Sequence, residues 1–326
     1  MNKSIKIFIK WIAAPVLAVW LFYSLFQQVK NQPGLDSALE LIKSAPYGIA
    51  AWKFWLVIFM VFVNWGIEAR KWQLLMNSIQ PMGFVTAFKS VLCGVTLSLN
   101  TPNRIGEYLG RVLFVKEGGR LQAVSLSIVG GIAQLIITMI MGCMGLAWLL
   151  LLSDQDSWVL RLSVLWLKIF FWGSVSGTIL ILVFFFRLNW LIRLLEKMPY
   201  SYRFVKYISV LETFDAKILL RLLSLSFFRY IVFVLQYIFM LQLMLVEPQY
   251  WPGFWLVSVM FWILAIIPSF AIAELGIRGT VAITLFAYSL NTAGILAVTF
   301  SIWFINLFIP ALIGSLLIWG IKIKKE

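Results

Sequence analysis

Long apolar runs dominate the sequence and predict a bundle of membrane-spanning helices. A bilayer core needs about 20 apolar residues per spanning helix. Runs of that length occupy residues 11–29, 52–75, 121–152, 158–186, 222–245 and 293–320. The first run follows three lysines and is not followed by a small-x-small cleavage site, so we interpret it as a retained helix and not as a signal peptide. The pattern predicts an all-α polytopic membrane protein with six spanning helices.

Two further apolar stretches are each interrupted by a proline. The stretch 84–116 stops at Pro102 and continues as a second helix, and the stretch 253–290 breaks at Pro268 before it resumes. Proline has no backbone N–H and disrupts a helix interior. Each stretch therefore consists of two short helices joined near a proline.

The distribution of charge predicts how these two stretches meet the membrane. Segment 187–221 is rich in Lys and Arg, loop 153–157 is acidic, and the C-terminus ends in lysines. Basic loops stay in the cytoplasm. They do so here only if both interrupted stretches return to the face from which they enter. We therefore predict two re-entrant hairpins that enter from opposite faces, with both chain termini in the cytoplasm.

This topology predicts an inverted repeat within one transmembrane domain, residues 1–326. Half one covers about 52–152, half two covers about 222–320, and the cytoplasmic loop 187–221 separates them. Each half is a helix, a hairpin and a helix, and the two halves run in opposite directions. In transporters, such repeats place the binding site near the midplane, where broken helices meet.

Composition excludes several classes of protein. The chain is 62% hydrophobic and only 12% charged, whereas soluble domains are about 25% charged. A soluble enzyme, a disordered protein and a nucleic-acid binder are therefore poor interpretations. The net charge of +14 fits cytoplasmic loops that meet anionic lipid headgroups.

The sequence offers little for catalysis, metals or cofactors. It has no histidine, which removes His-based catalysis and His ligands. Its two cysteines, Cys93 and Cys143, lie in apolar stretches and are expected to be core residues. We expect neither a metal nor a cofactor, and no enzyme activity. A membrane enzyme with Glu107 and Glu274 as an acid–base pair is the weaker alternative.

Ionisable residues cluster after both prolines and form the candidate substrate-binding site: Arg104, Glu107, Arg111, Glu274 and Arg278. A charge at the bilayer centre costs roughly 2.5–3.5 kcal/mol, so these residues must pair or line a wet cavity. Arginine forks and helix N-termini suit a lipid phosphate. The alternative is that Arg104–Glu107 and Glu274–Arg278 are local pairs that only close the hairpins.

Other residues receive structural interpretations. The hairpin tips are expected to depend on prolines and glycines, namely Pro102, Gly106, Pro268, Gly276 and Gly279. At the end of run 52–75, Glu68, Arg70 and Lys71 are interpreted as a solvated helix end, with the inner mouth of the cavity as the alternative. The Gly173-x-x-x-Gly177 pattern leaves a homodimer open.

The segment Thr101-Pro-Asn-Arg-Ile-Gly-Glu107, the Pro268…Gly-Ile-Arg278 segment and the helix layout resemble the lysylphosphatidylglycerol synthase transmembrane-region family, over about residues 10–320. This flippase-like domain occurs in multiple peptide resistance factors and in stand-alone bacterial membrane proteins. The family's first motif usually reads Pro-Gly-Arg-x-Gly-Glu, and Asn103 replaces its glycine here. The second usually reads Gly-Gly-x-Gly-x-Arg-Glu. Here Ala273-Glu274 replace the glycine pair, and Gly279 replaces the final acid.

The resemblance implies movement of a phospholipid, or of an aminoacylated or glycosylated lipid, between the leaflets of the bacterial cytoplasmic membrane. No aminoacyl-transferase domain follows in this sequence, so we expect a role in transport or as an accessory to another enzyme. The expected partners are membrane lipids and not nucleic acid, and a lipid-synthesising enzyme partner stays open. A small-solute or ion transporter with the same inverted repeat is the alternative function.

Overall fold

The structure is a computed structural model of the chain. It describes residues 35–99, 101, 105–153, 164–187, 190, 207–247, 249–267 and 271–320, without the side chains of 35, 37, 38, 209, 213 and 271–274. The predicted first span, 11–29, both helix-breaking prolines and Arg104 lie outside the described residues, and so does the side chain of Glu274.

Among the described residues, five helical segments are long and apolar enough to cross a membrane. They are α4 (Ala51–Met76), α7 (Arg120–Ser153), α8 (Val164–Phe186), α11 (Ala216–Leu243) and the continuous run of α14 (Thr292–Trp303), η7 (Phe304–Phe308) and α15 (Ile309–Gly320). These segments match five of the six predicted spans. They are joined by shorter helices, and no strand occurs in the described ranges.

The shorter helices and single turns include the arms of both interrupted stretches. They are α3 (Leu35–Ser44), α5 (Phe84–Ser98), α6 (Gly106–Arg111), η3 (Val112–Phe114), η4 (Glu117–Gly119), η5 (Ser209–Thr213), α12 (Tyr250–Ile266), α13 (Ala271–Leu285) and η6 (Ala287–Ser289). Helix α3 was not predicted, because the segment before run 52–75 is polar and contains Pro33 and Pro46.

One predicted boundary is wrong. The basic segment was expected to run to residue 221 as a loop, but α11 already begins at Ala216. The Asp215 side chain caps this helix by accepting a 2.8 Å hydrogen bond from the backbone N–H of Ile218. Such a cap satisfies one of the free N–H groups of a first turn, and it starts the helix earlier than hydropathy indicates.

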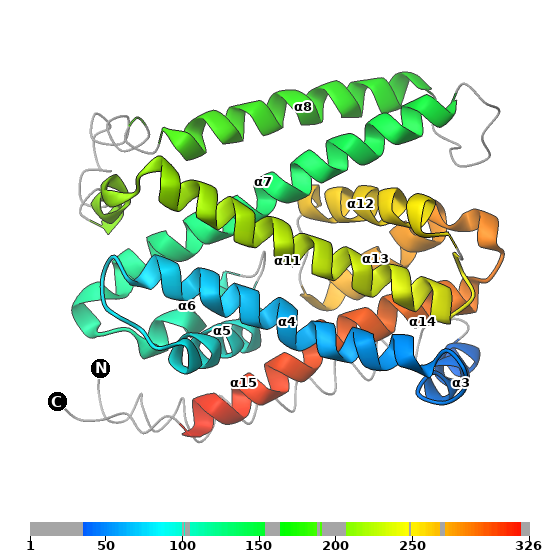
Figure 1. Ribbon diagram of the computed structural model, residues 1–326, viewed down its shortest axis with the longest axis horizontal. Coiled ribbons are helices and arrows are strands. Elements are labelled where there is room, and N and C mark those ends of the chain that lie inside the picture. The colour runs from blue at the N-terminus through cyan, green and yellow to red at the C-terminus, as the bar shows by residue number, and fades with distance from the viewer. Residues whose placement is uncertain are drawn as a thin grey trace.

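The two helical hairpins lie in opposite halves of the molecule (Figure 1). The α5–α6 hairpin lies near the end where α4 and α15 finish, and the α12–α13 hairpin lies near the end where α4 starts. Between the halves, α4 packs against α11, α7 packs against α12, and α5 packs against α15. The last two contacts correspond: in each, the first arm of one hairpin meets a spanning helix of the other half.

Glycines allow both of these corresponding contacts to be close. A Cβ on Gly142 of α7 would collide with the Trp262 side chain of α12. A Cβ on Gly314 of α15 would collide with the backbone carbonyl of Leu92 in α5. Here Thr96 donates from Oγ1 to the carbonyl of Ala311 at 2.8 Å, which adds a polar bond between the halves. Small residues at a crossing let two backbones approach, which is typical of helix packing in membranes.

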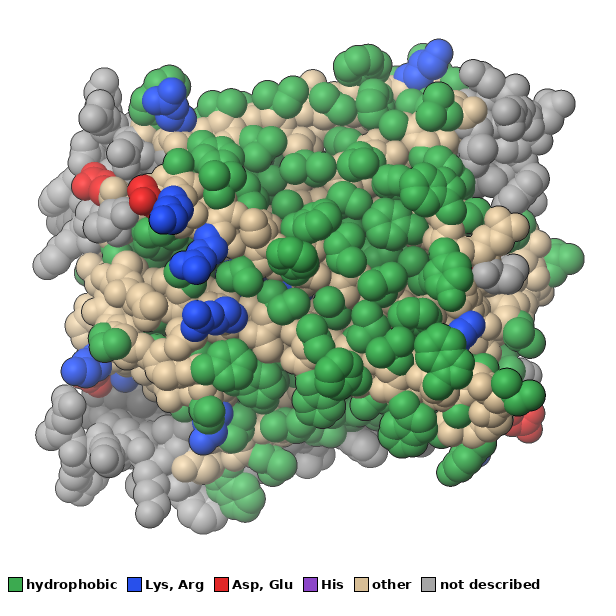
Figure 2. All heavy atoms as spheres, in the orientation of Figure 1, with side chains coloured by type: hydrophobic (Ala, Val, Ile, Leu, Met, Phe, Trp, Pro, Cys, Tyr) green, Lys and Arg blue, Asp and Glu red, His purple; other side chains and the backbone are tan. Residues whose placement is uncertain are grey.

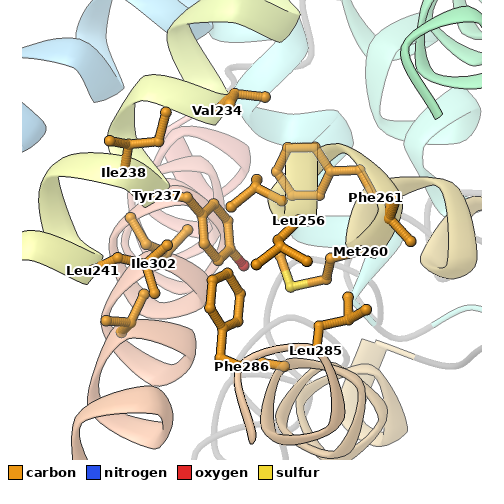
Figure 3. Packing of buried hydrophobic residues seen from close by; sticks show 14 of the residues in the cluster. Val234, Tyr237, Ile238, Leu241, Leu256, Met260, Phe261, Leu285, Phe286 and Ile302 are labelled. Atoms are coloured by element: carbon orange, nitrogen blue, oxygen red, sulfur yellow. The ribbon is translucent and has the colours of Figure 1, made fainter. Parts of the chain in front are cut away.

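Among the described residues, the apolar interior consists of two clusters. The first contains residues of α11, α12, α13 and α14, packed around the Tyr237 ring (Figure 3). The second contains residues of α4, α5, α7 and α15, with the ring of Trp72 fully buried. Helices α4, α7 and α11 each contribute to both clusters, so each passes from one to the other along its length.

The surface is apolar along the middle of the molecule. Figure 2 shows hydrophobic side chains over most of one face, with Lys and Arg gathered mainly toward the end where α4 finishes and α11 begins. Exposed side chains on α8 include Trp172 and Leu180. Such an apolar band with a basic end fits a lipid environment.

The last span contains an irregular turn. Its segment η7 is a π-helix, and Pro310 follows in α15. Proline has no N–H to donate to the carbonyl one turn before it, and π-turns are a common adjustment of a helix at such places. Asn306 lies within this turn, with only 4% of its surface exposed.

Candidate functional site

The first hairpin holds its ionisable residues in place through very close helix packing. Helix α6 runs back along α5, and Gly106 and Gly110 lie against the backbone of Leu97 and Cys93. A Cβ at either glycine would collide with a backbone carbonyl. This contact fixes the position of the next residue, Arg111.

Arg111 links the hairpin to a spanning helix. Its guanidinium forms an ion pair with Glu107 one turn earlier, and its Nη2 lies 2.7 Å from Oε1 of Glu68 on α4. Only 3% of the Arg111 side chain is exposed, against 25% of the Glu107 side chain. Of the predicted site, the structure therefore brings Glu107 and Arg111 together. The predicted Arg104–Glu107 pair falls outside the described residues.

Glu68 also forms ion pairs with two more cations. Its Oε2 lies 2.8 Å from Nζ of Lys71 and 3.3 Å from Nη1 of Arg229, which lies on α11. Glu68 and Lys71 are 3% and 1% exposed, so their interpretation as a solvated helix end is wrong. The third member of that group, Arg70, is exposed and bonds Gln73. The described cluster thus contains Glu68, Lys71, Glu107, Arg111 and Arg229.

Aromatic rings and a serine orient the cations of this cluster. The Arg111 guanidinium lies 5.4 Å from the centre of the Trp72 ring, and that of Arg229 lies 5.3 Å from the Trp65 ring. Trp72 donates from Nε1 to Oγ of Ser90 at 2.9 Å, and Ser90 donates to the Arg111 carbonyl at 2.8 Å. Cation–π contacts of this kind stabilise desolvated cations.

Neutral amides extend the cluster to other spans. Arg229 donates from Nε to Oδ1 of Asn64 at 2.9 Å and from Nη1 to Oε1 of Gln134 at 3.4 Å. Asn64 donates from Nδ2 to Oδ1 of Asn306 at 3.2 Å. One polar network therefore joins α4, α7, α11 and the π-turn of the last span. Sequence analysis missed Arg229, although an arginine inside an apolar run is a signal of function.

The second hairpin has a different partner set. Arg278 of α13 donates from Nη1 to the hydroxyl of Tyr237 on α11 at 3.0 Å, and Arg278 is 8% exposed. In this region, a Cβ added to Gly279 would make only an ordinary contact with the Leu296 side chain, and Gly276 is half-buried. The described side chains thus place Arg278 beside Tyr237, within the first apolar cluster.

The side chains at these positions can bind anions and polar groups. Guanidinium and ammonium groups hold phosphate or carboxylate, and carboxamides add neutral donors. No group of three Cys, Asp or Glu side chains that would suit a metal ion occurs in the part of the chain that the structure describes. The free thiol of Cys93 is buried and contacts the carbonyl of Gly314.

Comparison with known proteins identifies the family of this chain. No curated protein matches it in a sequence search. The model of the family described as "Lysylphosphatidylglycerol synthase TM region" matches residues 11–314, which include both hairpins, all five described spans except the end of the last, and the run 11–29. This match agrees with the resemblance noted over about residues 10–320 of the sequence. The chain belongs to the lysylphosphatidylglycerol synthase transmembrane-region family.

Proposed function

We propose that this protein is a flippase-like transporter that moves a phospholipid, or an aminoacylated or glycosylated lipid, between membrane leaflets. The observation that carries the proposal is the buried pair between Arg111 of the first hairpin and Glu68 of α4. Ionisable residues inside a membrane protein are expensive and usually serve a substrate or ion pathway. The family match adds a membrane lipid as the expected type of substrate.

The proposal includes a specific topology. The two hairpins enter the bilayer from opposite faces, the run 11–29 supplies a sixth span, and both termini lie in the cytoplasm of a bacterium. The position of the hairpins in opposite halves supports this topology (Figure 1), and so does the gathering of Lys and Arg at one end (Figure 2). The corresponding α7–α12 and α5–α15 contacts support an inverted repeat.

In this scheme the hairpin residues contact the headgroup while the acyl chains stay in the bilayer. Arg111 and Arg278 are the cations that meet the phosphate, and Glu107 and Glu274 balance them or hold a cationic headgroup. The Arg111–Glu68 pair lies within the first half, and the Arg278–Tyr237 pair lies within the second. The ion pair of Glu68 with Arg229 of α11 joins the two halves. A movement of one half against the other, as in other transporters with inverted repeats, would therefore alter the contact between Glu68 and Arg229.

The test is lipid translocation in proteoliposomes. Fluorescent lipids with several headgroups are reconstituted with the purified protein, and a membrane-impermeant quencher is added outside. We expect Arg111→Gln to abolish the protein-dependent loss of inner-leaflet fluorescence. The matched control is Arg70→Gln, because Arg70 is exposed near the end of α4, one residue before Lys71.

The outcomes separate the alternatives. Equal translocation by the wild type and Arg111→Gln would refute the site. Ion flux without movement of any lipid would favour the small-solute or ion transporter. No movement of lipid or ions by folded protein would favour an accessory subunit of a biosynthetic enzyme.

A further inference from the structure

The buried cluster around Glu68 carries more positive than negative charge. Lys71, Arg111 and Arg229 each form an ion pair with Glu68. Arg111 also pairs with Glu107, the second carboxylate of the cluster. Within the described residues the cluster therefore has a surplus of one positive charge. An uncompensated buried charge is strongly destabilising, so a site of this kind is suited to an anion that carries one negative charge.

The amide side chains that extend this cluster, together with Arg229, lie near the middle of the spanning helices. Asn64, Gln134, Arg229 and Asn306 each lie at or next to the centre of a candidate span. They also fall close to the positions where their helices pass from one apolar cluster to the other. These polar side chains thus lie near the level at which the two apolar clusters meet. Because water is absent from the middle of a bilayer, this level is where a translocating polar group most needs protein partners.

Arg229 is the cation through which this site can be reached. Its side chain is 22% exposed, whereas the side chains of Lys71 and Arg111 are 1% and 3% exposed. Its contacts to Glu68 and Gln134 share Nη1 and are long, at 3.3 and 3.4 Å. Among the described residues no partner of its Nη2 is found. The guanidinium therefore retains donor capacity for a further acceptor.

We propose that Arg229, backed by Lys71 and Arg111, binds a phosphate group with one negative charge at mid-height in the membrane. The phosphodiester of a phospholipid carries that single charge, and the amide oxygens of Asn64 and Gln134 accept hydrogen bonds from Arg229 and orient its guanidinium. Charge-assisted hydrogen bonds from a guanidinium suit phosphate oxygens. This site rests on the proposed function and deepens it, because it adds Arg229 and Lys71, which lie on spanning helices outside the hairpins, to the path of the lipid phosphate.

Binding is tested on the full-length protein in a non-ionic detergent. The melting temperature is titrated with phosphatidylglycerol, with diacylglycerol of the same acyl chains, and with inorganic phosphate. We expect phosphatidylglycerol to raise the melting temperature of the wild type and diacylglycerol to leave it unchanged. A rise with inorganic phosphate alone would keep the anion site but assign it to free phosphate, which would overturn its place in lipid transport.

Variants of one helix make the test specific. We expect Arg229→Gln to weaken phosphatidylglycerol binding about tenfold or more, because the variant loses a charge-assisted hydrogen bond to the phosphate. Arg221→Gln, at an exposed arginine two turns earlier on α11, is the matched control and should bind as the wild type does. If Arg229→Gln does not fold, Arg229→Lys keeps the charge without the guanidinium, and we expect it to bind phosphatidylglycerol more weakly than the wild type does.

Binding and transport give distinguishable failures. Undiminished phosphatidylglycerol binding by Arg229→Gln, or weakening as large in Arg221→Gln, would overturn the phosphate site and leave the proposed transport intact. Arg229-dependent binding without any lipid translocation would support the phosphate site and refute the transport function.

Discussion

Glu68 contacts three cations but carries only one negative charge, so it cannot neutralise all of them. The three cations come from α4, α6 and α11, so this one side chain joins the first hairpin to two spanning helices. Surface ion pairs contribute little to stability. Here Glu68, Lys71 and Arg111 are almost entirely shielded from solvent, and Arg229 is partly exposed. The charge of Glu68 therefore stabilises the packing of both the first hairpin and α11 against α4.

We expect Glu68→Gln to lower the free energy of unfolding by about 3–5 kcal/mol, because it leaves buried cations without their partner. The glutamine keeps the size of the side chain, so the loss reports charge and not packing. Thermal melting in detergent, followed by circular dichroism, measures the effect. The control is Glu117→Gln, since the Glu117 side chain is 86% exposed and its pair with Arg120 is long. A loss as large in the control would contradict the explanation.

Glu247 connects stability to pH outside the spanning segments. Its side chain is buried between α11 and α12 and accepts a 2.8 Å hydrogen bond from the backbone N–H of Gln249. Burial raises the pKa of this carboxyl above its ordinary value, while the bond from Gln249 opposes that rise. The folded state therefore binds the proton more tightly than the unfolded state does. The stabilisation is complete below the unfolded pKa and is lost as pH rises through the folded pKa.

We expect Glu247→Gln to remove this dependence, because the amide keeps an acceptor for Gln249 and cannot ionise. Between pH 4 and pH 7 the wild type should lose stability relative to the variant by about 1.4 kcal/mol for each unit by which the pKa is raised. Melting temperatures across that range measure the difference. Parallel pH profiles of the two proteins would show that Glu247 does not contribute.

At the scale of elements, the α5–α6 hairpin depends on backbone contact. Gly110 lies against the carbonyl of Cys93 and the Cα of Gly94, so α6 has no room for a side chain on that face. Arg111 is the next residue, and its reach to Glu68 depends on this spacing. The packing of the hairpin and the position of its charge are therefore a single structural feature.

We expect Gly110→Ala to separate the two arms, lower stability by about 1–3 kcal/mol and reduce lipid translocation. The matched control is Gly131→Ala on α7, where an added Cβ would meet nothing within 4 Å. That change should be neutral or should stabilise the helix by up to about 1 kcal/mol. Melting and translocation assays on both variants test the idea, which fails if Gly110→Ala behaves like Gly131→Ala.

Elements were predictable where one local signal decides them. Hydropathy identified five described spans, and the proline breaks identified both interrupted stretches. Partners were less predictable, because they depend on tertiary distance. Glu68 and Lys71 have the sequence of a solvated helix end, and only the packing of α6 and α11 buries them. Arg229 was detectable as a lone arginine in an apolar run, but no sequence pattern links it to Asn64 or Gln134.

At the scale of the whole molecule, the α4–α11 crossing and the two corresponding helix contacts join the halves. Gly142 and Gly314 occupy equivalent places in those contacts, each on a spanning helix that meets the first arm of the other hairpin. The ends of the molecule differ in charge, and this difference determines the orientation that we expect in the membrane.

Orientation is testable with single cysteines at opposite ends. In right-side-out vesicles, a membrane-impermeant maleimide should label Ser44→Cys and should label Glu117→Cys only after permeabilisation. Both native residues are exposed. Ser44 is the last residue of α3, and Glu117 is the first residue of η4. Native Cys93 is buried, so replacing Cys143 alone by Ser provides the background. The reverse labelling pattern would show that the molecule is inverted.

The π-turn at Phe304–Phe308 rotates the faces of α15 about the helix axis relative to those of α14. A turn closed by i to i+5 bonds contains one residue more than an α-helical turn, and one residue corresponds to a rotation of about 100°. Removing one residue there would restore a continuous α-helix and rotate Gly314 away from Leu92, while α14 would keep its own neighbours. The faces of this span therefore have to be assigned separately on either side of Asn306, and a gap of one residue in a relative would mark a repacked interface.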